Sequence, residues 1–165
     1  MKETVDFDIR YSKVSDDKFL LKWMSDESIN KWFPVKTESE IKPFVKNWVG
    51  YSKFKASLTA VVNDVPCGIG ALFLMPYKKI CHQCFFQVAV DEKYQNKGIG
   101  KSLVKNLINL SKNYFKHELI YADIFEGCLI EKILVDLGFE KFAQQKDYVF
   151  ENNTYKDRIC YGLVF

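Results

Sequence analysis

One six-residue segment near the middle of the chain, Gln-Asn-Lys-Gly-Ile-Gly at residues 95–100, has the composition of an anion-binding loop. The apolar residues before it predict a strand, and the amphipathic residues after it predict a helix. Backbone N–H groups that enter a helix form a concave anion site, which the helix dipole strengthens. Gly98 and Gly100 let the backbone approach a phosphate group without an intervening Cβ atom. The segment therefore predicts a loop that holds phosphate.

Two well-known phosphate loops fit this segment poorly. A nucleotide P-loop requires G-x-x-x-x-G-K-[ST], and the chain ends this pattern correctly with Gly100, Lys101 and Ser102. The first glycine of that pattern is replaced by Gln95. A dinucleotide loop requires G-x-G-x-x-G, and Leu103 stands where its third glycine belongs. Both interpretations are therefore disfavoured.

A third pattern, [QR]-x-x-G-x-[GA], matches residues 95–100 in full. The match extends to the end of the preceding strand, with Val88 and Val90, and to the helix that follows. This segment resembles the acetyl-CoA loop of the GNAT superfamily of N-acetyltransferases. A second segment at residues 134–142, Leu-Val-Asp-Leu-Gly-Phe-Glu-Lys-Phe, is similar to the family's Y-x-x-x-G-F segment. The resemblance covers residues 5–165 and is greatest to the ribosomal-protein N-acetyltransferase and spermidine acetyltransferase branch.

The resemblance implies a mixed α/β (α+β) fold with one GNAT-like domain over residues 1–165. Its central, mostly antiparallel, twisted sheet of roughly seven strands would carry helices on both faces and be splayed between the fourth and fifth strands. Acetyl-CoA would be the co-substrate, with its pantetheine arm paired to strand backbone. The implied cofactor-binding residues are Val88, Val90, Gln95, Asn96, Lys97, Gly98, Ile99, Gly100 and Lys101. For Lys97 and for Lys101, considered one at a time, a solvent-exposed position on the surface is as good an interpretation as a phosphate contact.

The implied reaction is direct attack of a primary amine on the acetyl thioester in a ternary complex, without a covalent enzyme intermediate. The amine would belong to a small molecule, a polyamine or a peptide N-terminus. Three side chains that commonly serve the family's chemistry are missing, however. Leu134 stands in the place of the tyrosine acid, Gly127 in that of an asparagine and Phe85 in that of the glutamate base. The alternative is therefore an acyl-CoA-binding regulatory or interaction protein without catalysis.

Asp123 is the residue that we predict to replace the missing base. It lies on a predicted strand at residues 118–125, in phase with Leu119 and Tyr121 and among apolar neighbours. A carboxylate in such surroundings can have a raised pKa and accept a proton. A strand-end residue bonded to backbone or solvent is the competing interpretation. Further candidates for the cleft are Trp32, Phe33 and Pro34, which a staple between the first two helices explains equally well. Tyr121, Cys128 and Tyr148 are also candidates, although packing is the favoured interpretation for them.

The elements that must position these residues alternate along the chain in the order β α α β β β α β α β β. Strands are predicted at residues 5–11, 57–75 (two strands turning at Asn63 and Asp64), 84–90, 118–125 and 148–165 (a hairpin). Helices are predicted at residues 15–33, 37–53, after Gly100 and at 129–137. Ser15 is the expected N-cap of the first helix, and Thr37 with Glu40 fits a capping box for the second.

Composition and charge bear on the partners, the location and the cysteine chemistry of the protein. A formal charge of +3 over 165 residues gives no indication of a nucleic-acid partner. We expect a cytoplasmic protein, because no apolar signal core or membrane span is apparent. We expect it to be a monomer or a homodimer. The five cysteines lack a framework spacing, so reduced thiols are expected. Cys81 and Cys84 form a C-x-x-C without a second ligand pair, so no metal site is expected.

Overall fold

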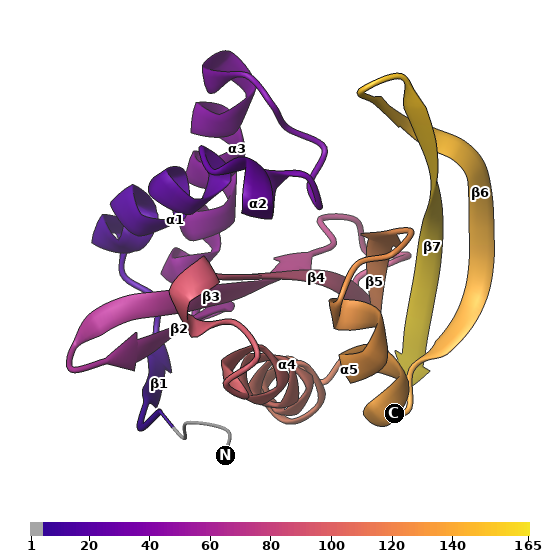
Figure 1. Ribbon diagram of the computed structural model, residues 1–165. Coiled ribbons are helices and arrows are strands. Elements are labelled where there is room, and N and C mark those ends of the chain that lie inside the picture. The colour runs from indigo at the N-terminus through magenta and orange to yellow at the C-terminus, as the bar shows by residue number, and fades with distance from the viewer. Residues whose placement is uncertain (1–4) are drawn as a thin grey trace.

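The computed structural model describes residues 5–165, which form one mixed α/β domain (Figure 1). The strands are β1 (Asp8–Tyr11), β2 (Ser57–Val62), β3 (Val65–Leu74), β4 (Gln83–Val90), β5 (Leu119–Phe125), β6 (Glu140–Glu151) and β7 (Thr154–Val164). The helices are α1 (Asp17–Met24), α2 (Glu27–Asn30), α3 (Glu38–Gly50), α4 (Ile99–Asn109) and α5 (Ile130–Asp136). The predicted fold class is confirmed. Residues 1–4, which the expected domain includes, lie outside the described residues.

One sheet of seven strands forms the centre of the domain, in the order β1-β2-β3-β4-β5-β7-β6. Every neighbouring pair is antiparallel except β4 and β5, which are parallel. A parallel pair needs a crossover connection, and α4 supplies it between these two strands. The predicted mostly antiparallel sheet of about seven strands is confirmed.

The parallel pair separates soon after it begins. β4 and β5 are paired from Gln83 opposite Leu119 to Phe85 opposite Tyr121, and no further. Both strands continue beyond this point, β4 to Val90 and β5 to Phe125. The sheet is therefore splayed between its fourth and fifth strands, as predicted.

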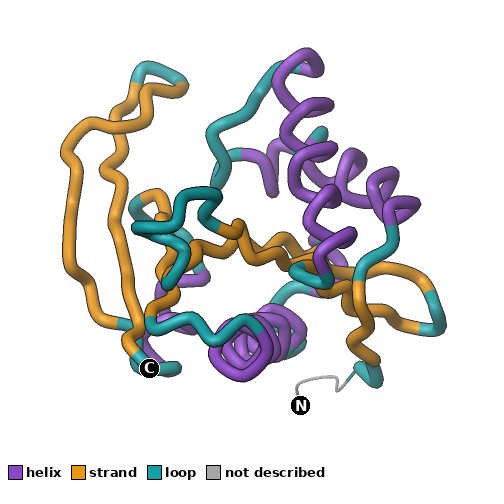
Figure 2. The backbone as a smooth tube through the Cα atoms, turned by 180° about the vertical axis from the view of Figure 1, so that it is seen from behind, coloured by secondary structure: helices purple, strands orange, loops and turns teal. Residues whose placement is uncertain are grey.

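Helices cover both faces of the sheet, with α1, α2 and α3 on one face and α4 and α5 on the other (Figures 1 and 2). Each face has its own apolar core, one built on Trp48 of α3 and the other on Leu103 and Leu107 of α4. α4 lies close to β3 because Gly70 has no side chain. A Cβ atom on Gly70 would come within 2.8 Å of the Leu107 Cδ1 atom.

Two local sequence signals act as predicted. Thr37 and Glu40 form the capping box of α3, in which the Glu40 carboxylate accepts a 2.9 Å hydrogen bond from the Thr37 backbone N–H. Asn63 and Asp64 turn the chain between β2 and β3 with φ values of 48° and 64°. Both are left-handed, which a tight hairpin turn of this kind requires.

The first predicted helix is wrong in its extent. Residues 15–33 form the end of a 3₁₀ turn (Val14–Asp16), α1 and α2, and Ser15 is not an N-cap. The reason is the position of two carboxylates. Asp16 accepts a 2.9 Å hydrogen bond from the Lys13 backbone N–H and fixes the turn. Asp26 accepts one of 2.9 Å from the Ser28 backbone N–H and starts α2 as a separate helix.

The predicted final hairpin starts too late. β6 begins at Glu140, directly after Phe139, whereas the sequence places its start at Tyr148. β6 is an edge strand with almost all its side chains exposed, so it lacks the apolar alternation by which strands are found.

None of the helices within residues 5–165 has the length and apolar character to cross a membrane.

Candidate functional site

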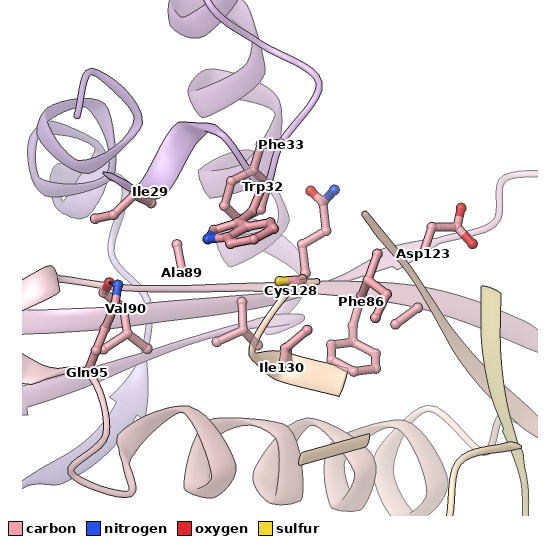
Figure 3. A pocket seen from close by; sticks show the side chains of 14 residues that line it. Ile29, Trp32, Phe33, Phe86, Ala89, Val90, Gln95, Asp123, Cys128 and Ile130 are labelled. Carbon is pink, nitrogen blue, oxygen red and sulfur yellow. Dashed lines mark hydrogen bonds between the residues drawn. The ribbon is translucent and has the colours of Figure 1, made fainter. Parts of the chain in front are cut away.

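A cleft follows the free part of β4, from the glycine loop toward the divergence of β4 and β5. It consists of two adjoining cavities of about 350 and 100 Å³. The larger one is lined by the loop and by α5, and the smaller one by β4 and β5. Both cavities are lined by Trp32, Val88, Val90, Gln95, Cys128 and Ile130. Figure 3 shows Gln95 at one end, Trp32 above Cys128 in the middle and Asp123 at the other end.

The edge of β4 that faces this cleft has backbone groups available for a ligand. The Asp91 N–H donates to the Cys67 carbonyl on β3 at 2.9 Å, and hydrogen-bonded pairs alternate along an antiparallel ladder. The backbone groups of Val88 and Val90 therefore turn away from β3. Just before the start of β4, the backbone of His82 also turns away from β3. Its carbonyl accepts a 2.8 Å hydrogen bond from the backbone N–H of Glu118, next to β5. Val88 and Val90, singled out in the sequence, thus present backbone to the splayed gap.

Residues 95–100 form a turn that leads into the N-terminus of α4, as the sequence predicts. Asn96 and Gly98 have left-handed φ values of 59° and 89°, and Gly98 is the N-cap of α4. An ideal Cβ atom at Gly98 would meet no atom within 4 Å, so the space above this loop is open. Ile99 is fully buried and anchors the loop in the core. The loop has the form of an anion cradle at a helix N-terminus.

Three side chains predicted to add donors to this cradle have protein partners. Gln95 Nε2 donates a 3.1 Å hydrogen bond to the Val90 carbonyl. The Lys97 ammonium lies 5.8 Å from the centre of the Tyr94 ring. Lys101 pairs with Asp136 of α5 at 3.0 Å. The backbone of the loop therefore provides the more accessible donors, and the lysines set the positive charge around it.

The positions of the three missing family side chains are filled by packing. Leu134 is fully buried in the core beneath α5 and does not line the cleft. Phe85 is stacked on Phe73 at 4.4 Å and on Tyr121 at 5.9 Å between ring centroids. Gly127 has a φ of 83° in the turn before α5. A tyrosine, glutamate or asparagine at these places would have to displace apolar packing or strain the backbone.

Asp123 lines the inner cavity from β5, and its carboxylate pairs with the Arg158 guanidinium of β7. Burial would lower the pKa of Arg158, but the hydrogen bond and charge of Asp123 outweigh it and raise that pKa. The Arg158 guanidinium also lies 5.1 Å from the centre of the Tyr148 ring. Tyr121 and Asp123 also line a further hollow over β5, β6 and β7. Asp123 is thus at the cleft, with a fixed cationic partner.

The polar residue that the sequence analysis overlooked is Gln87 on β4. It lines the inner cavity, and its Oε1 atom is buried without a hydrogen-bond partner among the described residues. A buried unpartnered acceptor costs about 1–3 kcal/mol, so such atoms indicate a missing ligand or water. The signal was present in the sequence, because Gln87 is the one polar residue in the apolar stretch of residues 84–90.

The aromatic residues after α2 line the cleft and also pack against α3. Trp32 and Phe33 line the inner cavity. Phe33 also packs against Trp48 of α3, with ring centroids 5.7 Å apart. Pro34 is exposed and lines neither cavity. Cys128 lines both cavities, and burial raises the pKa of its thiol, which favours the unreactive protonated form.

The other cysteines are separated from the cleft. All five cysteines are free thiols, and Cys81 is exposed whereas Cys84 is buried. The Cys84 thiol contacts Ser111 Oγ at 3.3 Å and therefore points into the core. Across residues 5–165, no three His, Cys, Asp or Glu side chains gather in an arrangement that could hold a metal ion.

Comparisons with known proteins agree with this geometry. The sequence profile of the acetyltransferase (GNAT) domain matches residues 9–160. The yncA protein of Salmonella typhimurium, solved with its cofactor acetyl-CoA, is similar in fold with a TM-score of 0.82 and 15% identity. That match covers 96% of this chain and 94% of the other. A ribosomal-protein-alanine N-acetyltransferase from Brucella melitensis has a TM-score of 0.78 at 18% identity, covering 95% and 99% of the two chains.

One curated relative also matches in sequence. The L-amino acid N-acetyltransferase AaaT of Escherichia coli is 26% identical over 77 residues, which cover 46% of this chain. The matched part spans about half, 48%, of that relative's length. The structural matches establish the fold, and the profile spans nearly the whole chain. The predicted family is therefore confirmed: this chain belongs to the GNAT family of acetyltransferases.

Proposed function

We propose that this protein is an N-acetyltransferase that moves the acetyl group of acetyl-CoA to the primary amine of a small molecule. The observation that carries the proposal is the cleft itself. It starts at an anion cradle, follows free strand backbone, and ends where β4 and β5 part beyond Phe85. A long ligand with a phosphate group at one end and a peptide-like arm fits such a path. Family membership supports the same chemistry.

The residues present suit acetyl-CoA. The backbone of Gly98, Ile99 and Gly100 would hold the pyrophosphate, since no Cβ atom of residue 98 or 100 stands in the way. The backbone groups of Val88 and the Val90 N–H would pair with the pantetheine amides by strand addition, since the Val90 carbonyl already accepts a hydrogen bond from Gln95. When bound, acetyl-CoA supplies an activated acetyl thioester. The inner cavity, of about 100 Å³, is then where amine and thioester would meet.

Direct attack by the amine suits the side chains around this cavity. Cys128 is the thiol that lines both cavities, and because burial raises its pKa it is a poor nucleophile. No covalent intermediate is therefore needed. The unpartnered Gln87 Oε1 atom would accept a hydrogen bond from the amine N–H and orient its lone pair. We propose Asp123 as the group that takes the amine proton, directly or through water.

The thiolate has no tyrosine acid to protonate it, because Leu134 is buried in the core. A CoA thiol is acidic enough to leave as thiolate where N–H groups or water stabilise it. Loss of one general acid typically costs about 10²–10⁴-fold in rate. We therefore expect a modest turnover. The filled positions Phe85, Gly127 and Leu134 also favour a second candidate, a protein that binds acyl-CoA and does not catalyse.

One experiment separates the two candidates. Acetyl-CoA is titrated calorimetrically, and release of free thiol is then followed with a panel of amines that includes amino acids, polyamines, aminoglycosides, amino sugars and peptide N-termini. Amine-dependent thiol release establishes the transferase. Binding of acetyl-CoA without release for any amine would support the binding protein. Absence of acetyl-CoA binding would contradict both.

A further inference from the structure

Two lysines from distant parts of the chain meet at Trp32. The Lys31 ammonium lies 5.1 Å and the Lys156 ammonium 5.0 Å from the centre of the indole ring. Lys31 is the C-cap residue of α2, whereas Lys156 lies on β7. The two ammonium groups are no farther apart than the sum of these distances. Each distance is within the range of a cation–π contact, so the ring holds both charges close to it.

Neither lysine forms an ion pair with a residue that the structure describes. Three carboxylates on β5, β6 and β7 have other cationic partners. Glu151 pairs with Lys36 at 3.2 Å, and Asp157 pairs with Lys146 at 2.8 Å. Asp123 pairs with Arg158. Two like charges at one ring repel each other, and an anion placed beside them would remove that cost.

This positive charge is placed on the cleft. Trp32 lines both cavities, and Figure 3 shows its ring above Cys128. The charges of Lys156 and Lys31 also act on the Cys128 thiol, opposing the burial that raises its pKa. The field of the two lysines therefore reaches the middle of the cleft, where both cavities meet.

Two segments that contact each other border the same region. The Lys36–Glu151 ion pair joins the segment between α2 and α3 to the tip of the β6–β7 hairpin. Figures 1 and 2 show these two segments approaching each other on the side of the sheet covered by α1 to α3. Lys156 makes a second link to the same segment through Trp32. The acceptor side of the cleft is thus bounded by two segments that meet, which suits a small molecule.

We infer that the acceptor amine carries an anionic group, a carboxylate or a phosphate, which Lys31 and Lys156 hold beside Trp32. This inference rests on the proposed acetyltransferase function. An ammonium group binds either anion as a point charge, and the lysines would orient the molecule with its amine toward the inner cavity. Polyamines, which bring only positive charge to the same place, would be poor acceptors.

The test uses pairs of amines that differ only in the anionic group. Glycine is compared with glycinamide, and phosphoethanolamine with ethanolamine, by amine-dependent thiol release. The acidic member of at least one pair should have the higher kcat/KM, by about 10- to 100-fold for a charge-assisted contact. Lys31→Gln with Lys156→Gln should abolish that preference and leave the Kd for acetyl-CoA unchanged. Lys105→Gln, an exposed lysine on α4, is the matched control and should keep the preference.

The outcomes separate this inference from the proposed function. Acetylation of the member without the anionic group as fast as the member that carries it would overturn the inference and leave the transferase intact. Weaker acetyl-CoA binding in the double lysine variant, with the preference kept, would assign the lysines to the cofactor and also overturn it. No turnover with any amine would remove the proposed function and this inference together.

Discussion

The side-chain amide of Gln95 donates a hydrogen bond of 3.1 Å to the Val90 carbonyl, so the glycine loop is fastened to the end of β4. This contact connects the two parts of the proposed cofactor site, the anion cradle and the free strand edge. We expect Gln95→Ala to weaken acetyl-CoA binding by roughly 2- to 10-fold, since one hydrogen bond contributes about 0.5–1.5 kcal/mol. Gln95→Glu should bind worse, because a carboxylate cannot donate and repels phosphate.

Isothermal titration with acetyl-CoA measures both variants. Gln145→Ala, an exposed glutamine on β6, serves as the control and should bind like the wild type. Equal affinity of Gln95→Ala and wild type would show that the loop keeps its position without this contact.

Gly100 offers a test of how closely a ligand approaches the loop. A Cβ atom there would meet Ile133 and Val90 side chains at 3.7 Å, an ordinary contact, and residue 100 lies in the first turn of α4. Gly100→Ala should therefore keep or raise the free energy of unfolding by up to about 1 kcal/mol. Acetyl-CoA affinity should stay near that of the wild type in Gly100→Ala, because the loop pattern admits alanine at this place. Gly100→Val should lower the affinity, because its branched side chain would occupy the space of the pyrophosphate.

A matched glycine separates the two effects. Gly50 ends α3, and its added Cβ atom would meet nothing within 4 Å. Gly50→Ala should gain stability in the same way and leave acetyl-CoA binding unchanged. Urea unfolding and calorimetric titration of both variants give the comparison. Unchanged acetyl-CoA binding in a folded Gly100→Val variant would contradict the assignment of the loop to the pyrophosphate.

The loop and the order of most elements along the chain could be predicted from sequence because their causes are local. Gly98 needs a left-handed backbone, and the residues around it determine the turn. Lys156 could not be assigned in this way, because its contact with Trp32 depends on how β7 and α2 meet in space. The start of β6 was missed for a related reason. β6 is held in the sheet by backbone pairing with β7, and its side chains are mostly exposed and show no apolar alternation.

His117 predicts a pH dependence of stability. It is buried, and Ser111 Oγ lies 3.0 Å from its Nδ1 atom. Burial lowers the pKa of His117 below its ordinary value, and the nearby His82 adds to this effect. The unfolded chain therefore takes up a proton first as pH falls through about 6.5, and the free energy of unfolding decreases from there toward the folded-state pKa.

Urea unfolding at about pH 7.5 and about pH 5.5, on either side of the ordinary histidine pKa, measures the effect. The wild type should lose stability over this interval, and His117→Gln should lose less. Exposed His82→Gln is the control and should retain most of the loss. An equal loss in wild type and His117→Gln would assign the pH dependence to other groups.

Asp123 and Arg158 allow the proposed proton acceptor to be tested against a purely structural role. Asp123→Asn should bind acetyl-CoA normally and turn over about 10²–10⁴-fold more slowly. Arg158→Met removes the cationic partner and leaves the carboxylate, so it should keep substantial turnover. Slow turnover in both variants with loss of stability would indicate that the ion pair only supports the structure. A wild-type rate in Asp123→Asn would favour a water chain instead.

Gln87 gives the most discriminating prediction, because replacing it should preserve or raise the stability of the protein and at the same time weaken binding of the acceptor amine. Its Oε1 atom is buried without a partner among the described residues, so Gln87→Leu removes an unsatisfied acceptor. The free energy of unfolding should stay the same or rise by about 1 kcal/mol. If the same oxygen orients the amine, the KM for the acceptor should rise about 5- to 10-fold, the equivalent of one hydrogen bond.

The Kd for acetyl-CoA in Gln87→Leu should not change, because the proposed cofactor contacts are made by backbone. Gln87→Glu keeps an acceptor at the same place and should restore most of the acceptor KM. A variant that loses stability and keeps its acceptor KM would reverse the expectation and assign Gln87 to the packing of β4 alone. Steady-state thiol release at varied amine concentration, together with urea unfolding, distinguishes the two results.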